Sequence, residues 1–365
     1  MNDKLIRFID CYIPTETCNL RCKYCYIAQK RKFNSKVCQF DKSPEDICAA
    51  LSQKRLGGTC LINFCAGGET LLTPELYDIV RLLLEEGHYI MIVTNGVLTK
   101  PLSRFWQLPD SLKSHLMFKF SFHYLEMLRL NIMDTFCDNV KRTRLSGCSI
   151  SVEVTPSDEL IPHIKDLKEV CLNEFGAVCH VTIARNDNRN GIDLLTELTV
   201  DEYKNTWGEF ESEMFSTKMN LYHVKRKEFC HAGDWSLYTN LLTGDIYQCY
   251  CGKRIGNLYD MSQPIIPQAV GKHCALPYCY NGHAFLTLGV IAGLDLHPFA
   301  DLRDRETSDN KGWLSPEMKQ FLSQRLFDNN EEYSSSKMLK SNIKQLPYSV
   351  KVRTRRLLSR FRRKS

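Results

Sequence analysis

The sequence predicts an α/β protein built on a parallel sheet. Three observations carry this prediction: six short runs of mostly apolar residues, helix-like segments between them, and turn or cap residues at the junctions. This alternation is typical of parallel sheets, because a parallel pair of strands needs a long crossover, usually a helix. The predicted strands span residues 6–13, 59–64, 89–94, 117–123, 149–155 and 179–184.

Helices are predicted between these strands. One begins after Ser43, because serine caps a helix well, Pro44 suits the first position, and Glu45 and Asp46 place acid in the first turn. Another runs from Thr73 to a glycine stop at residue 87. Two more are predicted over residues 125–145 and 162–175.

Composition limits the class of protein. At 365 residues the chain is long enough for one large domain and an extension. It contains no run of about 18 apolar residues and does not begin like a signal peptide, so the sequence predicts a cytoplasmic protein. In that compartment 17 cysteines favour metal or redox chemistry over structural disulfides.

The net charge of +6 comes from the end of the chain. Residues 336–365 hold 11 Lys and Arg and no acid, which leaves 37 basic against 42 acidic residues elsewhere. The body is therefore mildly acidic, and any binding to a polyanion belongs to the tail. As a helix, the tail would gather Val350, Leu357, Leu358 and Phe361 on one side, which suits an anionic membrane surface or a polyanion. A docked or solvated helix without a partner is the alternative.

Three cysteines follow the first predicted strand with the spacing C-x3-C-x2-C: Cys18, Cys22 and Cys25. Three thiolates at this spacing can hold three corners of an iron–sulfur cube, and the absent fourth ligand leaves one iron open. The alternatives are half of a zinc site completed by Cys11 or His88, or a chance cluster. A Gly-Gly-Glu motif at residues 67–69, after the second strand, favours the iron–sulfur interpretation.

With these two motifs the chain resembles the radical S-adenosylmethionine (SAM) enzymes, which carry C-x3-C-x-aromatic-C after the first barrel strand and Gly-Gly-Glu after the second. The resemblance implies an α/β fold, a partial (β/α)6 TIM-type barrel with a small cysteine-rich C-terminal extension. The active site of such a barrel lies at the carboxyl ends of the strands. The resemblance also implies that Cys18, Cys22 and Cys25 hold a 4Fe–4S cluster whose fourth iron binds SAM.

The resemblance implies further contacts with SAM. Gly67, Gly68 and Glu69 would contact the methionine ammonium, because glycines permit close backbone approach and a carboxylate accepts charge-assisted hydrogen bonds. Tyr24 would lie beside the adenine, and Ser121, at the end of the fourth strand, would contact SAM.

Two more polar residues lie at or near strand ends. Alternation places His123 on the same face as Ser121, where it would face the substrate or bond to a neighbouring loop. Glu153 lies inside the apolar fifth strand. A lone acid there is costly unless it is paired, so Glu153 is a candidate for ribose or substrate contact. No residue is assigned a catalytic role.

A second cysteine group begins at Cys230. Cys230 and Cys249 flank a strong hairpin signal at residues 243–245, so the hairpin would bring them together at its open end. The group resembles the SPASM or shortened twitch extensions of radical SAM enzymes, which bind auxiliary iron–sulfur clusters. We expect one auxiliary 4Fe–4S cluster on Cys230, Cys249, Cys274 and Cys279, with Cys251 as the spare or a substitute for one of the last two. A structural zinc is the alternative. The other cysteines are expected in the core: Cys38, Cys48, Cys60, Cys65, Cys137, Cys148, Cys171 and Cys179.

The resemblance implies four segments: a radical SAM core over residues 1–225, the auxiliary-cluster extension over 226–285, a helical segment over 286–333 with a helix near 315–327, and the basic tail over 334–365. It also implies reductive cleavage of SAM to a 5′-deoxyadenosyl radical, which removes hydrogen from a substrate, and an electron donor such as flavodoxin or ferredoxin. Oxidative modification of a peptide or protein is the first interpretation. The first strand begins too early for a fused leader-recognition domain before it, so a separate carrier would be needed. Modification of a sugar, nucleotide or glycan precursor is the alternative, and a non-catalytic zinc or iron–sulfur scaffold is the second.

Overall fold

The computed structural model describes residues 3–188, 193–250, 252–276, 278–279 and 282–361. Within them, nine strands form one sheet in the order β11-β10-β9-β1-β2-β3-β4-β5-β6, and two short strands pair separately as β7-β8. The bounds of the strands are β1 Arg7–Ile13, β2 Cys60–Ala66, β3 Tyr89–Thr94, β4 Leu116–Phe122, β5 Ser149–Val154, β6 His180–Val181, β7 Arg185–Asn186, β8 Asp193–Leu194, β9 Ser236–Asn240, β10 Asp245–Tyr247 and β11 Arg254–Asn257.

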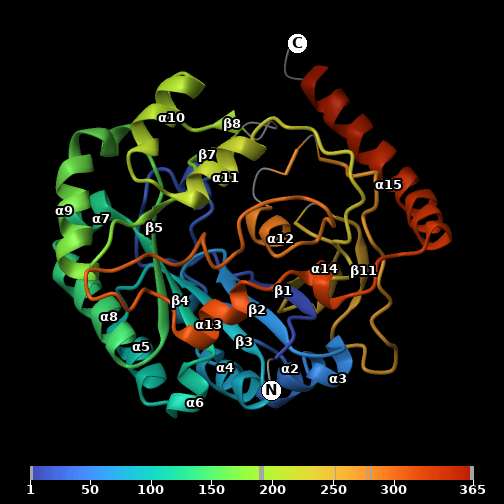
Figure 1. Cartoon of the computed structure of the whole chain (residues 1–365), viewed down its shortest axis with the longest axis horizontal. Coiled ribbons are helices and arrows are strands. Elements are labelled where there is room, and N and C mark those ends of the chain that lie inside the picture. Colours follow the sequence, from blue (N-terminus) through green and yellow to red (C-terminus); the bar gives the residue numbers. More distant parts are fainter. Residues whose placement is uncertain (1–2, 189–192, 251, 277, 280–281, 362–365) are drawn as a thin grey trace.

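Helices α4 to α9 lie around the outside of the sheet (Figure 1). In the described part of the chain the helices are α1 Tyr26–Gln29, α2 Pro44–Ala50, α3 Gln53–Leu56, α4 Leu76–Glu85, α5 Thr99–Trp106, α6 Asp110–Lys113, α7 Tyr124–Leu130, α8 Met133–Leu145, α9 Ile164–Phe175, α10 Val200–Gly208, α11 Glu213–Leu221, α12 His283–Thr287, α13 Pro316–Leu322, α14 Leu326–Asn329 and α15 Ser335–Phe361, with 3-10 turns η1 Thr70–Leu72 and η2 Asp158–His163.

The prediction of a parallel α/β sheet is confirmed. Strands β1 to β6 are parallel and follow one another in chain order, and β11 and β6 are the two edges of an open sheet. An open parallel sheet with outer helices is the architecture of a partial barrel. The last predicted strand, over residues 179–184, is shorter than expected, because only His180–Val181 pairs with β5.

Local sequence explains the start of α2 and the end of α7. Helix α2 begins with the predicted cap: the Ser43 side chain accepts from the Asp46 amide, and the Asp46 side chain accepts in return from the Ser43 amide. The single helix predicted over 125–145 is wrong. It breaks into α7 and α8 at Asn131, whose left-handed φ of 55° ends α7.

Alternation along the strands divides the sheet into an outer apolar face and an inner face. In β4 the outer residues Phe118, Phe120 and Phe122 are fully buried in the main core. The inner residues begin with an apolar layer that includes Phe8, Leu61 and Met117 and packs against the C-terminal segment. Above this layer the inner residues become polar and approach the carboxyl ends of the strands; they are Asp10, Asn63, Lys119, Ser121 and Glu153.

The cysteine-rich hairpin is part of the same sheet. Strand β9 pairs in parallel with β1, from Phe8 opposite Ser236 to Tyr12 opposite Asn240, and β10 returns antiparallel to β9. Gly244, with φ of 73°, makes the predicted turn between them. The hairpin therefore brings the second cysteine group beside the inner face of β1.

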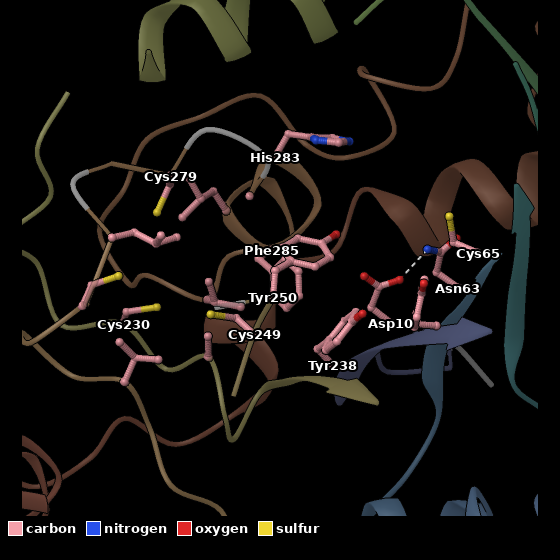
Figure 2. Close-up of a pocket in the computed structure, with 18 of the residues that line it drawn as sticks. Asp10, Asn63, Cys65, Cys230, Tyr238, Cys249, Tyr250, Cys279, His283 and Phe285 are labelled. Atoms are coloured by element: carbon pink, nitrogen blue, oxygen red, sulfur yellow. Dashed lines mark hydrogen bonds between the residues drawn. The ribbon is translucent and has the colours of Figure 1, made fainter. Parts of the chain in front are cut away.

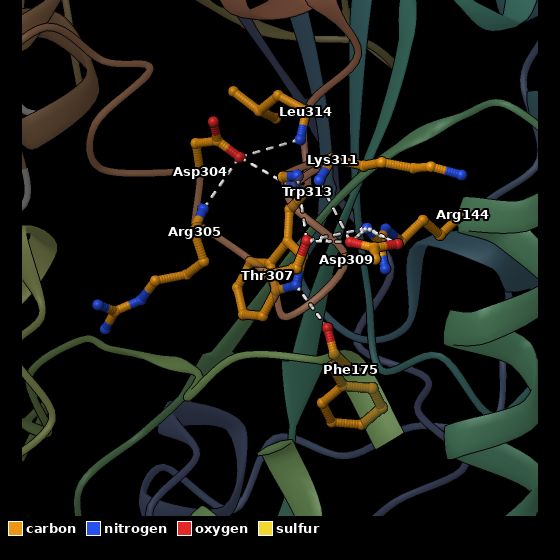
Figure 3. Close-up of polar contacts among 10 residues, drawn as sticks. Arg144, Phe175, Asp304, Arg305, Thr307, Asp309, Lys311, Trp313 and Leu314 are labelled. Carbon is orange, nitrogen blue, oxygen red and sulfur yellow. Dashed lines mark hydrogen bonds and ion pairs between the residues drawn. The ribbon is translucent and has the colours of Figure 1, made fainter. Parts of the chain in front are cut away.

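The C-terminal segment returns to the barrel through a loop over residues 304–314. In this loop Asp304 Oδ1 accepts from the amides of Trp313, at 2.8 Å, and Leu314, at 3.1 Å (Figure 3). Arg144 of α8 pairs with Asp309 at 2.8 Å, and Trp313 Nε1 donates to the Phe175 carbonyl. These contacts anchor the segment that carries Arg303 into the interior.

The end of the chain is helical. The helix predicted near 315–327 is divided into α13 and α14, whereas the basic tail forms the 27-residue helix α15 along one side of the molecule (Figure 1). Among the described residues, no helix is both long enough and apolar enough to cross a membrane.

Candidate functional site

The first cysteine group lines one cavity. Cys18, Cys22 and Cys25 lie in the loop between β1 and α1 and border a cavity of about 150 Å³. The strand ends supply its other polar walls, which include Gly67, Gly68, Glu69, Thr94, Asn95, Ser121 and His123. The structure thus brings four predicted SAM contacts, residues 67–69 and Ser121, to the three cysteines at the carboxyl ends of the strands, whereas Tyr24 and Glu153 are not among the residues that line this cavity.

The donor set fits an iron–sulfur cube. A cube offers each cysteine its own iron, so its ligands must surround a space rather than converge on one point. Burial, opposed in part by the Leu20 amide, raises the pKa of the Cys18 thiol to about 11. A buried thiolate therefore requires positive charge nearby, which an iron centre provides. Within the described ranges, no three His, Cys, Asp or Glu side chains converge on a single metal position.

Gly67 and Gly68 allow two segments of the chain to pack closely. A Cβ at Gly67 would lie 2.5 Å from the Thr15 carbonyl oxygen, and one at Gly68 only 1.9 Å from that of Thr17. The amides of Gly67, Gly68 and Glu69 donate in turn to the carbonyls of Ile13, Thr15 and Thr17. The sequence analysis predicted that the two glycines allow SAM to approach the backbone closely. In the structure, the position that a Cβ would occupy at each glycine instead faces the segment that leads into Cys18.

Glu69 joins the ends of β2 and β3. Its Oε1 accepts from Thr94 Oγ1 at 2.6 Å and from the Leu71 amide at 2.9 Å, and its Oε2 accepts from the Asn95 amide at 2.8 Å. Asn95 Nδ2 donates in turn to Asn19 Oδ1, at 2.7 Å, and lies 3.8 Å from Cys18 Sγ. Burial raises the pKa of Glu69, and these three bonds oppose that rise. Glu69 is therefore a positioning residue that connects β2, β3 and the cysteine loop.

Tyr24 and His123 bond to each other. The Tyr24 hydroxyl lies 2.6 Å from His123 Nδ1. Burial and Lys119 lower the pKa of His123 to about 4, so its ring is neutral at pH 7. Of the two alternatives for His123, the structure shows the bond to a neighbouring loop. Ser121 accepts from Lys119 Nζ at 3.1 Å.

Glu153 is not a lone acid. The sequence made it a candidate for ribose or substrate contact because an unpaired acid inside a strand is costly, and that reason is wrong because Glu153 is paired within the protein. Its carboxylate pairs with Lys119 Nζ at 3.0 Å and with Arg303 Nη1 at 3.1 Å. Burial acts to raise the pKa of Glu153, but Lys119, Lys218 and Arg303 hold it well below the usual range. The sequence contained no signal for Arg303 or Lys218, because neither lies in a motif and both come from segments far from β5.

The cluster around Glu153 carries more positive than negative charge. Arg303 and Lys218 are only 2% and 4% exposed. Arg303 Nη2 approaches His283 Nε2 at 2.9 Å; since a guanidinium only donates, Nε2 is the acceptor. Burial lowers the pKa of His283 well below its usual value, so the ring is neutral and its proton is on Nδ1, a buried atom without a partner in the described residues.

The second cysteine group lines a larger cavity of about 550 Å³. Cys230, Cys249, Cys274 and Cys279 all border it, as predicted for four ligands of one group; Cys251 lies outside the described residues. Figure 2 shows Cys230, Cys249 and Cys279 on one side and Asp10, Asn63 and Cys65 on the other, with the rings of Tyr238, Tyr250 and Phe285 between them. Burial and the neighbouring Cys274 raise the pKa of the Cys279 thiol to about 12.

Asp10 is a functional candidate that the sequence interpretation missed. It is an acid within an apolar strand, the same signal that singled out Glu153. Asn63 Nδ2 donates to Asp10 Oδ1 at 2.6 Å, the Tyr250 hydroxyl bonds to the same carboxyl group, and Asn63 Oδ1 has no partner in the described residues. Burial raises the pKa of Asp10 to about 6, although the hydrogen bonds from Asn63 and Tyr250 act to lower it.

Asp10→Asn should therefore stabilise the protein at pH 8. Because the folded-state pKa lies above the ordinary 3.8, the stability tied to Asp10 is present below pH 4 and is lost as the pH rises through 6. Removing the charge should add about 2–3 kcal/mol at pH 8 and little at pH 4, measured by urea denaturation at both values. The matched control is Asp41→Asn, at an exposed position, which should leave the free energy of unfolding unchanged at both pH values. Identical urea denaturation curves for Asp10→Asn and wild type at pH 8 would contradict the prediction.

The remaining cysteines agree with the expected core. Most are buried; Cys48 is half-buried, and Cys65 is half-buried in the wall of the larger cavity, beside the Gly67–Glu69 motif.

Comparison with known proteins supports the motif assignment. Residues 12–123 match the model of the radical SAM superfamily. Over 86 residues the chain is 31% identical to a Methanocaldococcus jannaschii protein named as a glycyl-radical enzyme activating enzyme; the match covers 24% of this chain and 31% of that protein, so the chain matches about a third of its curated relative.

The solved structures that align with the chain have low sequence identity to it. Streptococcus suis SuiB bound to S-adenosylmethionine aligns with a TM-score of 0.48 at 14% identity, over 71% of this chain and 65% of SuiB. The anSMEcpe protein with bound AdoMet aligns with a TM-score of 0.47 at 13% identity, over 95% of this chain and 99% of anSMEcpe. Residues 12–123, the part of the chain that is similar to the radical SAM superfamily, contain both the cysteine loop and the Gly-Gly-Glu turn.

Proposed function

We propose that the protein is a radical SAM enzyme that oxidatively modifies a substrate held between two iron–sulfur sites. Cys18, Cys22 and Cys25 would hold a 4Fe–4S cluster, with SAM in the adjoining cavity against residues 67–69 and Ser121. Tyr24, which bonds to His123 in the wall of this cavity, would lie near the adenine. When bound, the cluster supplies one-electron cleavage of SAM, using an electron from a donor such as flavodoxin or ferredoxin.

One observation carries this proposal: the two cavities meet at the end of β2. Ala66 lines both of them, Cys65 lies on the larger cavity, and Gly67 lies on the smaller. A substrate in the larger cavity would therefore lie directly beside the SAM site, with the second cysteine group on its far side. We assign an auxiliary 4Fe–4S cluster to Cys230, Cys249, Cys274 and Cys279 in the extension over residues 226–285. We place the whole protein in the cytoplasm.

A peptide or protein side chain is the first candidate substrate. The larger cavity has mostly apolar and aromatic walls, including Tyr12, Tyr238, Tyr250 and Phe285, and a few polar groups such as Asp10 and Asn63. Such a cavity binds one side chain through apolar contact and orients it with the polar groups. The carboxyl group of Asp10, with a pKa near 6, is suited to accept a proton as the substrate is oxidised.

The surplus of buried positive charge favours a second candidate, a sugar, nucleotide or glycan precursor with an anionic group. Lys119, Arg303 and Lys218 face the single carboxylate of Glu153, and His283 connects this cluster to the larger cavity. A substrate phosphate or carboxylate would balance the excess, since unpaired buried charge is costly.

The test is formation of 5′-deoxyadenosine by anaerobically reconstituted protein with dithionite and SAM. Wild type should contain roughly eight iron atoms per chain and cleave SAM, while Cys22→Ala should contain about four and lose cleavage. Cys249→Ala should also fall to about four but keep SAM cleavage. Cys48→Ala, which removes a half-buried thiol on α2 away from both cavities, should behave as wild type. Cleavage that persists in Cys22→Ala, or zinc in place of iron, would refute the proposal and favour the scaffold.

A further inference from the structure

Helix α15 packs with its polar face toward the protein. Ser341, Gln345 and Ser349, spaced four residues apart along one face, are 8% exposed or less. A surface helix of a soluble protein normally buries its apolar stripe instead. The orientation of α15 therefore requires a reason.

Specific hydrogen bonds fix this orientation. Gln248 Nε2 donates to Gln345 Oε1 at 3.0 Å, and the Tyr348 hydroxyl donates to the Gly252 carbonyl at 2.9 Å. Arg353 Nη2 donates to the Cys274 carbonyl at 2.7 Å. The polar face of α15 thus contacts the backbone of the loops that carry the second cysteine group, and rotating the helix to hide its apolar residues would break these bonds.

The outer face of α15 carries an apolar stripe. Its members are between 46% and 62% exposed and recur at intervals of four, three, four and seven residues, so they lie on one side of the helix. We call these residues the α15 stripe: Leu339, Ile343, Leu346, Val350 and Leu357. Single exposed apolar residues are ordinary, but a continuous row marks an interaction surface.

The charge around the stripe has one sign. The sequence of α15 has no acidic residue, and its exposed cations include Lys337, Lys340, Lys344, Lys351 and Arg355. Two copies of such a helix would repel each other if the stripes paired. An apolar stripe bordered by lysines complements a surface that is apolar beneath a layer of negative charge.

We propose that α15 docks the protein on an anionic lipid bilayer, with the α15 stripe at the boundary between headgroups and acyl chains. The helix lies in the plane of the surface and does not cross it. Because its inner face contacts the Gly252 and Cys274 carbonyls, the second cysteine group is held within about one helix diameter, ~10 Å, of the docked face. The proposal does not depend on SAM cleavage.

The inner contacts also change how the surface must be tested. Deleting residues 336–365 would remove the α15 stripe together with the bonds that brace the cysteine loops, so a deletion does not test the surface alone. Substitutions confined to the exposed stripe leave those bonds in place.

The experiment is flotation of the full-length protein with vesicles of phosphatidylcholine alone or with about 30% phosphatidylglycerol. Wild type should float with the anionic vesicles only, and less so at high salt. The triple variant Ile343→Gln, Leu346→Gln, Val350→Gln should bind at least about tenfold more weakly. The control Leu145→Gln, at an exposed leucine that ends α8, should bind as wild type, and an unchanged melting temperature verifies that each variant is folded.

Three results would overturn the proposal. The first is absence of wild-type flotation with anionic vesicles, and the second is equal flotation of the triple variant. The third is a dimer in sedimentation velocity that the stripe substitutions abolish without any vesicle binding, which would assign the surface to a second copy of the chain. Replacing Lys337, Lys340 and Lys344 by Gln should weaken anionic-vesicle binding, whereas heparin binding without flotation would assign the lysines to a soluble polyanion.

Discussion

Gly68→Ala should abolish iron loading at the first cysteine group. The new Cβ would lie 1.9 Å from the Thr17 carbonyl oxygen and 2.5 Å from its carbon, distances at which backbone must move. Thr17 directly precedes Cys18, and the Glu69 amide donates to the same Thr17 oxygen at 3.0 Å. Because the strain falls on backbone held by a ladder of hydrogen bonds, the cysteine loop has to shift. A misplacement of about 1 Å can cost a hundredfold in rate, so we expect SAM cleavage to fall by at least ~100-fold.

The measurement is iron content after anaerobic reconstitution, together with 5′-deoxyadenosine formation. Gly68→Ala should lose about half of its iron, because the second cysteine group is untouched. Gly208→Ala is the matched control: no atom lies within 4 Å of its added Cβ, so iron content and cleavage should not change. Full iron loading and normal cleavage in Gly68→Ala would show that the close packing seen here is not required.

The parts of the site that could be predicted are those encoded over short distances. The spacing of Cys18, Cys22 and Cys25, the Gly67–Glu69 motif and the hairpin before Cys249 each lie within one stretch of chain, and each appears where the motif places it. Strand alternation also placed Ser121 on the inner face correctly, because a period of two is fixed by the geometry of the backbone.

The parts that could not be predicted depend on segments that meet only after folding. Arg303 reaches Glu153 across 150 positions, and Lys218 reaches the same interior from α11. Helix α15 shows the same limit in another form. The sequence grouped only Val350 and Leu357 of the α15 stripe on one side of the helix. That the stripe faces outward depends on bonds to Gln248, Gly252 and Cys274.

Substitutions at Glu153 and Lys218 should have opposite effects on stability. Glu153→Gln removes the only carboxylate within the described part of the chain that pairs with Lys119 and Arg303, which leaves buried cations uncompensated. Loss of one partner of a buried ion pair costs about 3–5 kcal/mol, so the unfolding midpoint in urea should fall sharply. Lys218→Met keeps the length of the side chain but removes a cation whose ammonium donates only to the Thr182 hydroxyl among the described residues, and it should be neutral or stabilising.

The pH dependence distinguishes this account from a packing effect. Burial, opposed by Glu153, lowers the pKa of Lys218 from 10.5 to about 7. Since the folded-state pKa is depressed, the stability tied to Lys218 is present above pH 10.5 and is lost as the pH falls toward 7. The advantage of Lys218→Met over wild type should therefore be full at pH 6 and shrink between pH 7 and pH 10.

The same variant tests the anionic substrate. Inorganic phosphate should raise the melting temperature of wild type, by binding the surplus cations, and should raise that of Lys218→Met less. Lys218→Ala, which leaves a cavity as well as removing the charge, should lose stability that Lys218→Met retains. If Lys218→Met is as unstable as Glu153→Gln at pH 6, the cluster has no surplus charge, and the case for an anionic substrate group is lost with it.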